Sequence, residues 1–206
     1  MALDPLIFLD PHPRTRSMVF PPRVSEALGA QARVRCHFGS RAPDELVEAI
    51  LPEVSIIVGQ TRMQRERLAR ARNLKAILNV KGNWEPNIDY AEAQRLGIHV
   101  LSAAPAMARA VAEYCLSRAI NLGRGFSDAN RMFREHREAN GIAGNRCAGT
   151  PCGAVVGLVG FGNLGRSPVP LLGPFGCAIS AYDPWLPESE LRKHPIHPAS
   201  FGDVIS

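Results

Sequence analysis

The chain has 206 residues, of which 46% are hydrophobic, and its formal net charge is +5 at pH 7. This length allows one large domain or two small ones, each with a hydrophobic core. No apolar run is long enough to span a bilayer, and the N-terminus lacks a basic segment followed by a long apolar stretch. We therefore expect neither a membrane protein nor a secretory signal.

The positive charge does not indicate a nucleic-acid partner, because the basic residues are scattered along the sequence. The densest group consists of Arg62, Arg65, Arg67, Arg70 and Arg72. Glu66 interrupts this group, and the spacing is typical of a solvated helix face. We expect no nucleic-acid partner and no membrane partner.

Cysteines and histidines give no sign of a metal site. The cysteines are Cys36, Cys115, Cys147, Cys152 and Cys177, and no two of them form a Cys-x-x-Cys pair. An odd, scattered set is typical of reduced thiols in a cytoplasmic protein. Cys115 lies in an apolar helical pattern, which predicts a core position. The proline-containing stretch from His194 to His197 is predicted to be a surface loop.

Strands and helices are expected to alternate through the first hundred residues. The sequence predicts strands at 6–10, 32–38, 55–58, 74–80 and 98–101, and helices at 24–28, 43–51, 65–71 and 89–96. This order favours a parallel sheet with helices on its faces. The first domain, residues 1–104, is thus predicted to be α/β.

A second domain is predicted from residue 105 to residue 206. It begins with an amphipathic helix at 106–122, in which one stripe holds Val111, Tyr114, Cys115, Ala119 and Leu122. An arginine-rich helix at 127–138 and a polar, glycine-rich loop at 141–153 are expected to follow. The loop leads to a buried strand, a glycine turn, a helix and a second strand.

The glycine turn has the pattern G-x-G-x-x-G, which is typical of dinucleotide binding when it joins a strand to a helix. Gly160 permits the tight turn, Gly162 lets the backbone approach a pyrophosphate, and Gly165 lets the helix pack on the strand. The N–H groups at the helix start, around Asn163 and Leu164, are expected to face the phosphates together with the positive end of the helix dipole.

An acidic residue ends the next strand. Asp183 lies 18 residues after Gly165 (183 − 165 = 18) and can accept hydrogen bonds from the adenosine ribose hydroxyls. It would repel a 2′-phosphate, and the next residues, Pro184 and Trp185, supply no cation. The sequence therefore favours NAD over NADP.

The order of these segments resembles that of the D-isomer-specific 2-hydroxyacid dehydrogenases. The resemblance rests on the stretches 74–77, 87–89, 97–100 and 111–113, on the glycine turn, and on 182–187. It implies two α/β domains: a substrate-side domain with a flavodoxin-like parallel sheet over 1–104, and the first half of a Rossmann NAD-binding domain over 105–206. It also implies a 2-hydroxy or 2-keto acid substrate, and a homodimer for the full-length protein.

The resemblance also implies roles for the loop after the strand at 74–80. Backbone N–H groups of Lys81, Gly82 and Asn83 would hold the substrate carboxylate, and Asn83 would approach the nicotinamide end of the cofactor. Two departures from the family leave the substrate open. Trp84 stands where glycine is common, and Met107 stands where asparagine is common.

The arginine, glutamate and histidine that carry the family reaction match no residue before Ser206. We therefore expect the chain to be the N-terminal part of such an enzyme, and to be inactive by itself with NADH and 2-keto acids. A non-catalytic NAD-binding module for regulation or interaction is the alternative. A short-chain reductase is disfavoured, because no tyrosine is followed by lysine at the Tyr-x-x-x-Lys spacing.

Overall fold

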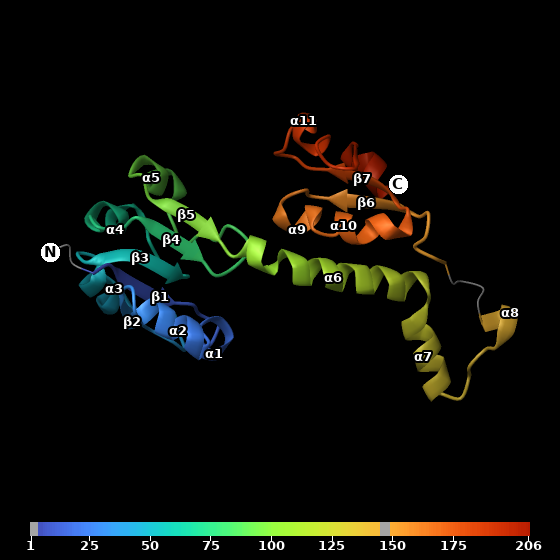
Figure 1. The fold of residues 1–206 in the computed structure, drawn as a ribbon, viewed down its shortest axis with the longest axis horizontal. Coiled ribbons are helices and arrows are strands. Elements are labelled where there is room, and N and C mark those ends of the chain that lie inside the picture. Colours follow the sequence, from blue (N-terminus) through green and yellow to red (C-terminus); the bar gives the residue numbers. More distant parts are fainter. Residues whose placement is uncertain (1–3, 145–148) are drawn as a thin grey trace. The chain divides into compact units, whose positions relative to one another are not determined.

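The computed structural model describes residues 4–144 and 149–206, and its internal contacts divide the chain into a unit that ends at Ala104 and a unit that begins at Pro105. Both units contain parallel sheets with helices, so the predicted α/β class is confirmed (Figure 1). Cys147, one of the five cysteines, lies outside the described residues. No helix in the described part of the chain combines the length and hydropathy that crossing a membrane requires.

The first unit is built on a five-stranded parallel sheet with the order β2-β1-β3-β4-β5, which is the flavodoxin-like order. Its strands are β1 (Leu6–Asp10), β2 (Arg33–Cys36), β3 (Val54–Gly59), β4 (Ala76–Asn79) and β5 (His99–Ser102). Its helices are α1 (Arg16–Val19), α2 (Pro22–Gly29), α3 (Asp44–Ile50), α4 (Arg65–Arg70) and α5 (Tyr90–Arg95). The predicted strands and helices of this unit are therefore present, with ends that shift by a few residues.

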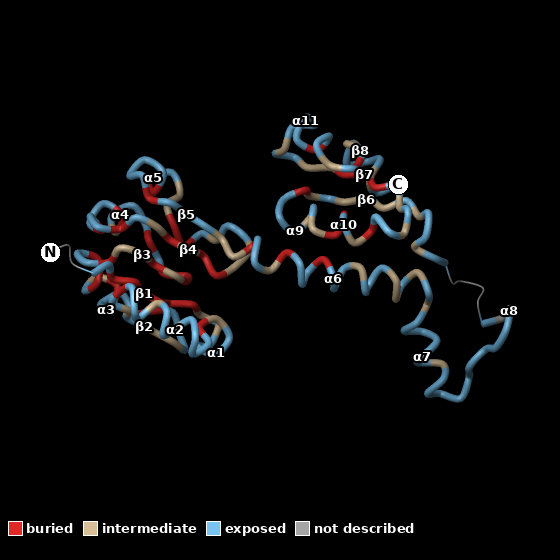
Figure 2. The backbone as a smooth tube through the Cα atoms, in the orientation of Figure 1, coloured by how far each residue is buried: buried red, intermediate tan, exposed pale blue. Residues whose placement is uncertain are grey.

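Two hydrophobic clusters lie on opposite faces of this sheet. The larger one packs Phe8 and Ile57 against α3, α4 and α5, and the smaller one packs Ile7 and Leu9 against α1 and α2. Successive side chains of a strand point to opposite faces, so β1 serves both clusters and all five of its residues are buried. Figure 2 shows this burial along β1.

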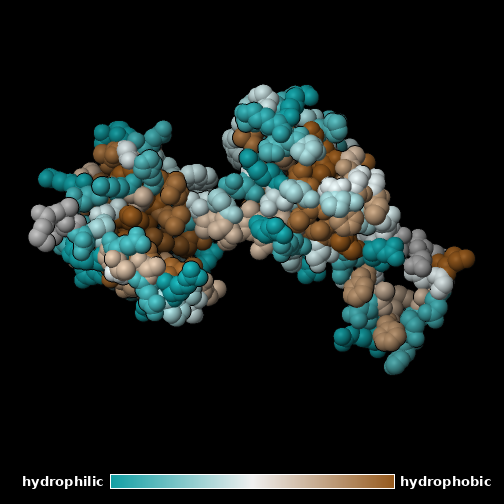
Figure 3. Space-filling model, in the orientation of Figure 1, coloured by the Kyte–Doolittle hydropathy of each residue, from teal (hydrophilic) through white to brown (hydrophobic). Residues whose placement is uncertain are grey.

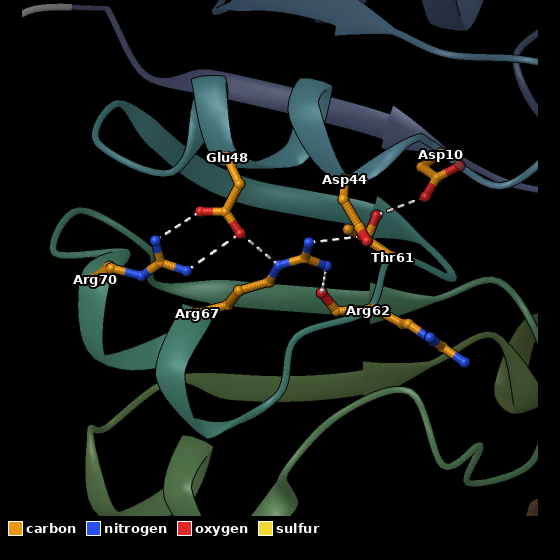
Figure 4. A network of polar contacts seen from close by, with 7 residues as sticks. All are labelled: Asp10, Asp44, Glu48, Thr61, Arg62, Arg67 and Arg70. Carbon is orange, nitrogen blue, oxygen red and sulfur yellow. Dashed lines mark hydrogen bonds and ion pairs between the residues drawn. The ribbon is translucent and has the colours of Figure 1, made fainter.

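The arginine group was wrongly predicted to be a solvated helix face, because Arg67 is largely buried. Its side chain is 11% exposed and lies between α3 and α4 (Figure 4). It pairs with Asp44 at 2.6 Å and with Glu48 at 2.9 Å, and it donates to the Arg62 carbonyl at 3.0 Å. Arg70 pairs with Glu48 at 2.7 Å, so the cluster joins the two helices through charge-assisted hydrogen bonds.

The second unit has a three-stranded parallel sheet with the order β6-β7-β8, as in the first half of a Rossmann domain. Its strands are β6 (Val155–Val159), β7 (Ala178–Tyr182) and β8 (His197–Pro198). Its α-helices are α6 (Ala104–Gly123), α7 (Phe126–Arg134), α8 (Gly141–Gly144), α9 (Asn163–Arg166), α10 (Val169–Leu172), α11 (Glu188–Leu191) and α12 (Phe201–Ile205). The helix expected at 127–138 thus ends at Arg134, and the loop expected at 141–153 begins with a helical turn.

Three predictions for the second unit were wrong, and the first two failed because periodicity does not show which face of an element is covered. Cys115 is exposed, and the buried positions of α6 are Ala104, Ala108 and Ala112 instead of the predicted stripe. The strand expected to be buried is an open edge: β6 pairs with β7 alone among the described strands, and Val155 and Val159 are 82% and 59% exposed. Figure 3 shows apolar atoms on the surface of this unit.

The third error concerns the helix after the glycine turn. Pro168 and Pro170 divide the helix into α9, α10 and a 3-10 turn at Gly173–Phe175, because proline has no N–H to continue the hydrogen-bond pattern. The stretch expected to be a surface loop is irregular at residues 194–196, as predicted, and enters a strand only at its last residue. His197 begins β8, and His194 lies edge-on to the Phe161 ring at a centroid distance of 5.1 Å.

The Arg67 cluster yields a prediction about stability and pH. Hydrogen bonds from Arg67 lower the pKa values of Asp44 and Glu48. Carboxylates with lowered pKa values stabilise the fold above their unfolded pKa, and this contribution is lost as pH falls through the folded pKa. We expect Arg67→Met to lower the free energy of unfolding by about 1–2 kcal/mol near neutral pH, and by less at about pH 3.

Urea unfolding at both pH values, followed by circular dichroism, measures this difference. Arg72→Met is the matched control, because Arg72 is exposed and has no ion pair within the described residues. An equal loss at both pH values in Arg67→Met would show that packing of the arginine, and not its charge, stabilises the helix pair.

Candidate functional site

Buried polar residues of the first unit gather at the carboxyl ends of its strands. Asp10 ends β1, Thr61 follows β3, and Asn79 ends β4. Asp10 accepts a hydrogen bond from the Thr61 hydroxyl at 2.8 Å (Figure 4) and another from the Ala42 N–H at 3.1 Å. This edge of a parallel sheet is where α/β proteins bind their ligands.

Asn87 connects the polar residues to the loop that follows β4. Its amide nitrogen donates to the Thr61 carbonyl at 3.1 Å and to Oδ1 of Asn79 at 3.4 Å. Asn79 precedes the loop and Asn87 ends it, so these contacts fix both ends of the segment that contains Lys81, Gly82 and Asn83. The Nδ2 atom of Asn79 is buried and has no partner within the described residues.

Glu85 organises the interior of this loop. Its carboxylate pairs with Lys81 Nζ at 3.1 Å and accepts from Asn83 Nδ2 at 3.2 Å. The Tyr90 hydroxyl donates to the Glu85 carbonyl and so holds the loop to the start of α5. Glu85 was not among the predicted site residues, although its position four residues after Lys81 favours an ion pair.

The loop leaves backbone donors unused. The N–H groups of Lys81, Gly82 and Asn83 have no acceptor within residues 4–104, whereas Ala103 N–H donates to the carbonyls of Asn79 and Lys81. Consecutive free N–H groups can bind an anion without adding a titrating group. Trp84 packs edge-on against Tyr90 at a centroid distance of 4.8 Å, and its side chain is 68% exposed.

In the second unit, the glycine turn is shaped by two glycines that no other residue can replace without strain. Gly160 has a φ of +86°, which L side chains rarely adopt, and its N–H donates to the Tyr182 carbonyl at 2.7 Å. A Cβ atom at Gly165 would lie 1.9 Å from the Gly160 carbonyl oxygen. The start of α9 therefore packs directly on the turn.

Gly162 differs from these two glycines, because no described residue of the second unit occupies the space beside it. A Cβ atom there would have no neighbour within 4 Å, and its φ is −70°. The N–H groups of Asn163 and Leu164 have no acceptor among the described residues of the second unit, as is usual in the first turn of a helix. The turn thus presents open space and free donors together.

Asp183 lies at the end of β7, and the backbone already binds both of its carboxylate oxygens. Oδ2 accepts from the Phe161 N–H at 2.7 Å, and Oδ1 accepts from Trp185 and Leu186 N–H, each at 2.9 Å. Burial acts to raise the pKa of Asp183, but these hydrogen bonds and the charge of Arg166 outweigh it and lower the pKa. Asp183 is therefore an anion at neutral pH.

Arg166 is a further residue of this site that the sequence analysis missed. Its Nε donates to the carbonyls of Phe161 at 3.3 Å and of Gly162 at 3.2 Å. Its Cζ lies 5.8 Å from the centroid of the Phe161 ring, as in a cation–π contact. The turn is thus held from one side by Asp183 and from the other by Arg166.

Adding one methyl group is expected to destabilise the second unit at Gly165 but not at Gly162. Gly165→Ala forces the Cβ atom onto the Gly160 carbonyl, so we expect it to destabilise the second unit by about 1–3 kcal/mol. Gly162→Ala meets no atom, and we expect a change within about 0.5 kcal/mol. Urea unfolding of both variants measures the difference, and an equal loss in both would contradict the packing assigned to Gly165.

The sequence of the chain is similar to those of known dehydrogenases and reductases. The family model described as "D-isomer specific 2-hydroxyacid dehydrogenase, catalytic domain" matches residues 17–190. The chain is 33% identical over 151 residues to a hydroxypyruvate reductase of Thermotoga maritima, covering 72% of this chain and 47% of that protein. It is 27% identical over 187 residues to a D-3-phosphoglycerate dehydrogenase of Mycobacterium tuberculosis, covering 90% of this chain and 34% of that protein.

The fold is also similar to solved structures. A phosphoglycerate oxidoreductase from Rhizobium etli superposes with a TM-score of 0.81 at 35% identity, over 98% of this chain and 62% of that chain. The chain therefore spans about half or less of the length of the two curated relatives, and under two thirds of this solved chain.

Proposed function

The chain belongs to the D-isomer-specific 2-hydroxyacid dehydrogenase family, and from this premise we propose that it serves NAD-dependent hydride transfer between a 2-hydroxy acid and the corresponding 2-keto acid. The observation that carries the proposal is the glycine turn, where open space beside Gly162 adjoins the free N–H groups of Asn163 and Leu164. Residues 105–206 would bind the dinucleotide, and residues 1–104 would bind the substrate.

The residues of the turn fit a dinucleotide. Gly162 leaves room for a pyrophosphate to approach the backbone, and the N–H groups of Asn163 and Leu164 would donate to its oxygens. Gly160 and Gly165 give the turn its shape. The bound nicotinamide would carry the hydride, while these residues only hold and orient the cofactor.

Asp183 would set the preference for NAD. Each carboxylate oxygen has two acceptor positions, so Oδ2, which accepts one backbone N–H, can accept a ribose hydroxyl as well. The lowered pKa keeps the group anionic at neutral pH, and an anion opposes the 2′-phosphate of NADP.

The loop after β4 would hold the substrate. The free N–H groups of Lys81, Gly82 and Asn83 would bind the carboxylate of the 2-hydroxy acid. Because Glu85 already pairs with Lys81 and Asn83 through their side chains, recognition would depend on the backbone donors. Asn83 would also approach the nicotinamide end of the cofactor. We place the protein in the cytoplasm, as a homodimer at full length.

Two substitutions test the proposed dinucleotide site. Gly162→Val should abolish NAD binding with little loss of stability, because its side chain enters space that only a ligand would use. Asp183→Ala removes charge-assisted hydrogen bonds of about 1.5–3 kcal/mol and should weaken NAD binding by about 10–100-fold.

Isothermal titration with NAD and thermal unfolding with and without NAD provide the readouts. Gly173→Val is the matched control, because Gly173 also has nothing within 4 Å of a Cβ atom but lies outside the turn. If Gly162→Val keeps the full NAD-induced thermal shift, the turn does not hold the pyrophosphate. NAD binding by the full-length protein without turnover of any 2-keto acid would favour a non-catalytic module.

A further inference from the structure

Arg166 and Asp183 place opposite charges on either side of one residue of the glycine turn. Asp183 Oδ2 accepts the N–H of Phe161 at 2.7 Å, and Arg166 Nε donates to the carbonyl of the same residue at 3.3 Å. The guanidinium carbon is 5.8 Å from the ring centroid of Phe161, whose side chain is buried. The Phe161 N–H thus binds the anion and the Phe161 carbonyl binds the cation, so both charges lie next to the glycine turn.

The guanidinium of Arg166 keeps most of its hydrogen-bonding capacity. Its Nε donates to the two turn carbonyls, but its terminal nitrogens have no acceptor in the part of this unit that the structure describes, and the residue is exposed. A guanidinium has five N–H donors, so four remain for a ligand, in the forked arrangement that matches a phosphate.

The arginine and the lysine that follow Asp183 in the sequence already form ion pairs. Arg192 pairs with Glu188 at 2.8 Å, and Lys193 pairs with Glu190 at 2.5 Å. Either residue would have to leave a carboxylate before it could bind a phosphate. Arg166 would not, because its contacts are with carbonyl oxygens and a ring.

We propose that Arg166 binds the 2′-phosphate of NADP. This contact partly offsets the repulsion that Asp183 exerts on the phosphate, and so reduces the preference for NAD over NADP. The inference rests on the proposed dinucleotide site and refines its cofactor preference. The chain then binds NAD more tightly than NADP, but by a smaller margin than an aspartate alone would produce. Asp183 favours the free ribose hydroxyls, and Arg166 favours the phosphorylated ribose.

Titration of NADH and NADPH, followed by their fluorescence, tests this balance in the wild type and in Arg166→Gln, Arg166→Lys and Asp183→Asn. A charge-assisted contact at an exposed position contributes about tenfold in affinity. Arg166→Gln should therefore weaken NADPH binding about tenfold while NADH binding changes by less than about threefold. Asp183→Asn should strengthen NADPH binding relative to NADH, and the double variant Asp183→Asn/Arg166→Gln should lose that gain.

Arg166→Lys keeps the charge and separates recognition from support of the turn. We expect it to retain more of the NADPH affinity than Arg166→Gln does, and added salt should weaken NADPH binding more than NADH binding in the wild type. Arg192→Gln, the matched control, should leave the ratio of the two affinities unchanged.

The outcomes separate the two proposals. If neither cofactor binds the wild type, the proposed dinucleotide site is wrong. If NADH binds and Arg166→Gln leaves the NADPH affinity unchanged, the role of Arg166 is wrong. Equal loss of both cofactors in Arg166→Gln and Arg166→Lys would show that Arg166 only supports the turn.

Discussion

The architecture of the second unit depends on one carboxylate that accepts three backbone hydrogen bonds. Asp183 joins the end of β7 to the glycine turn at Phe161 and to the segment that begins at Trp185. A partly buried carboxylate needs such donors, because the protein otherwise leaves its charge without solvation. The residue expected to recognise ribose is therefore also the residue that fixes the turn. Substitution of Asp183 therefore changes ligand chemistry and local geometry together.

The first unit holds its loop after β4 in a comparable way, with the Asn87 amide at one end and the Glu85 carboxylate within. Asn87 ties the end of the loop after β4 to Thr61 and Asn79, and Glu85 holds the loop's side chains from within. The backbone N–H groups of Lys81 to Asn83 are thus positioned by contacts on both sides before any anion arrives. Preorganised donors bind more tightly than mobile ones, since less ordering entropy is lost on binding.

The sequence predicted the order and type of most elements, because alternating apolar strands and capped helices leave local signals. Asp89, for example, accepts the Glu92 N–H and caps α5 where the helix was expected to begin. The faces of α6 and β6 were mispredicted, since periodicity identifies a stripe but not what covers it. The break after the glycine turn was readable from Pro168 and Pro170. The contacts of Arg67 and Arg166 could not be predicted in this way. The carboxylates that pair with Arg67 lie on another helix, and the contacts of Arg166 depend on its side-chain conformation.

The proline-broken segment that follows the glycine turn has a consequence for local motion. A long helix opens its backbone hydrogen bonds cooperatively, but α9, α10 and the 3-10 turn are short pieces that can open independently. Amide hydrogens in this segment should therefore exchange with solvent faster than those of β7, which lies inside the three-stranded sheet. A ligand that holds the start of α9 would slow exchange in α9 first, so the amides of these residues form a local reporter of occupancy.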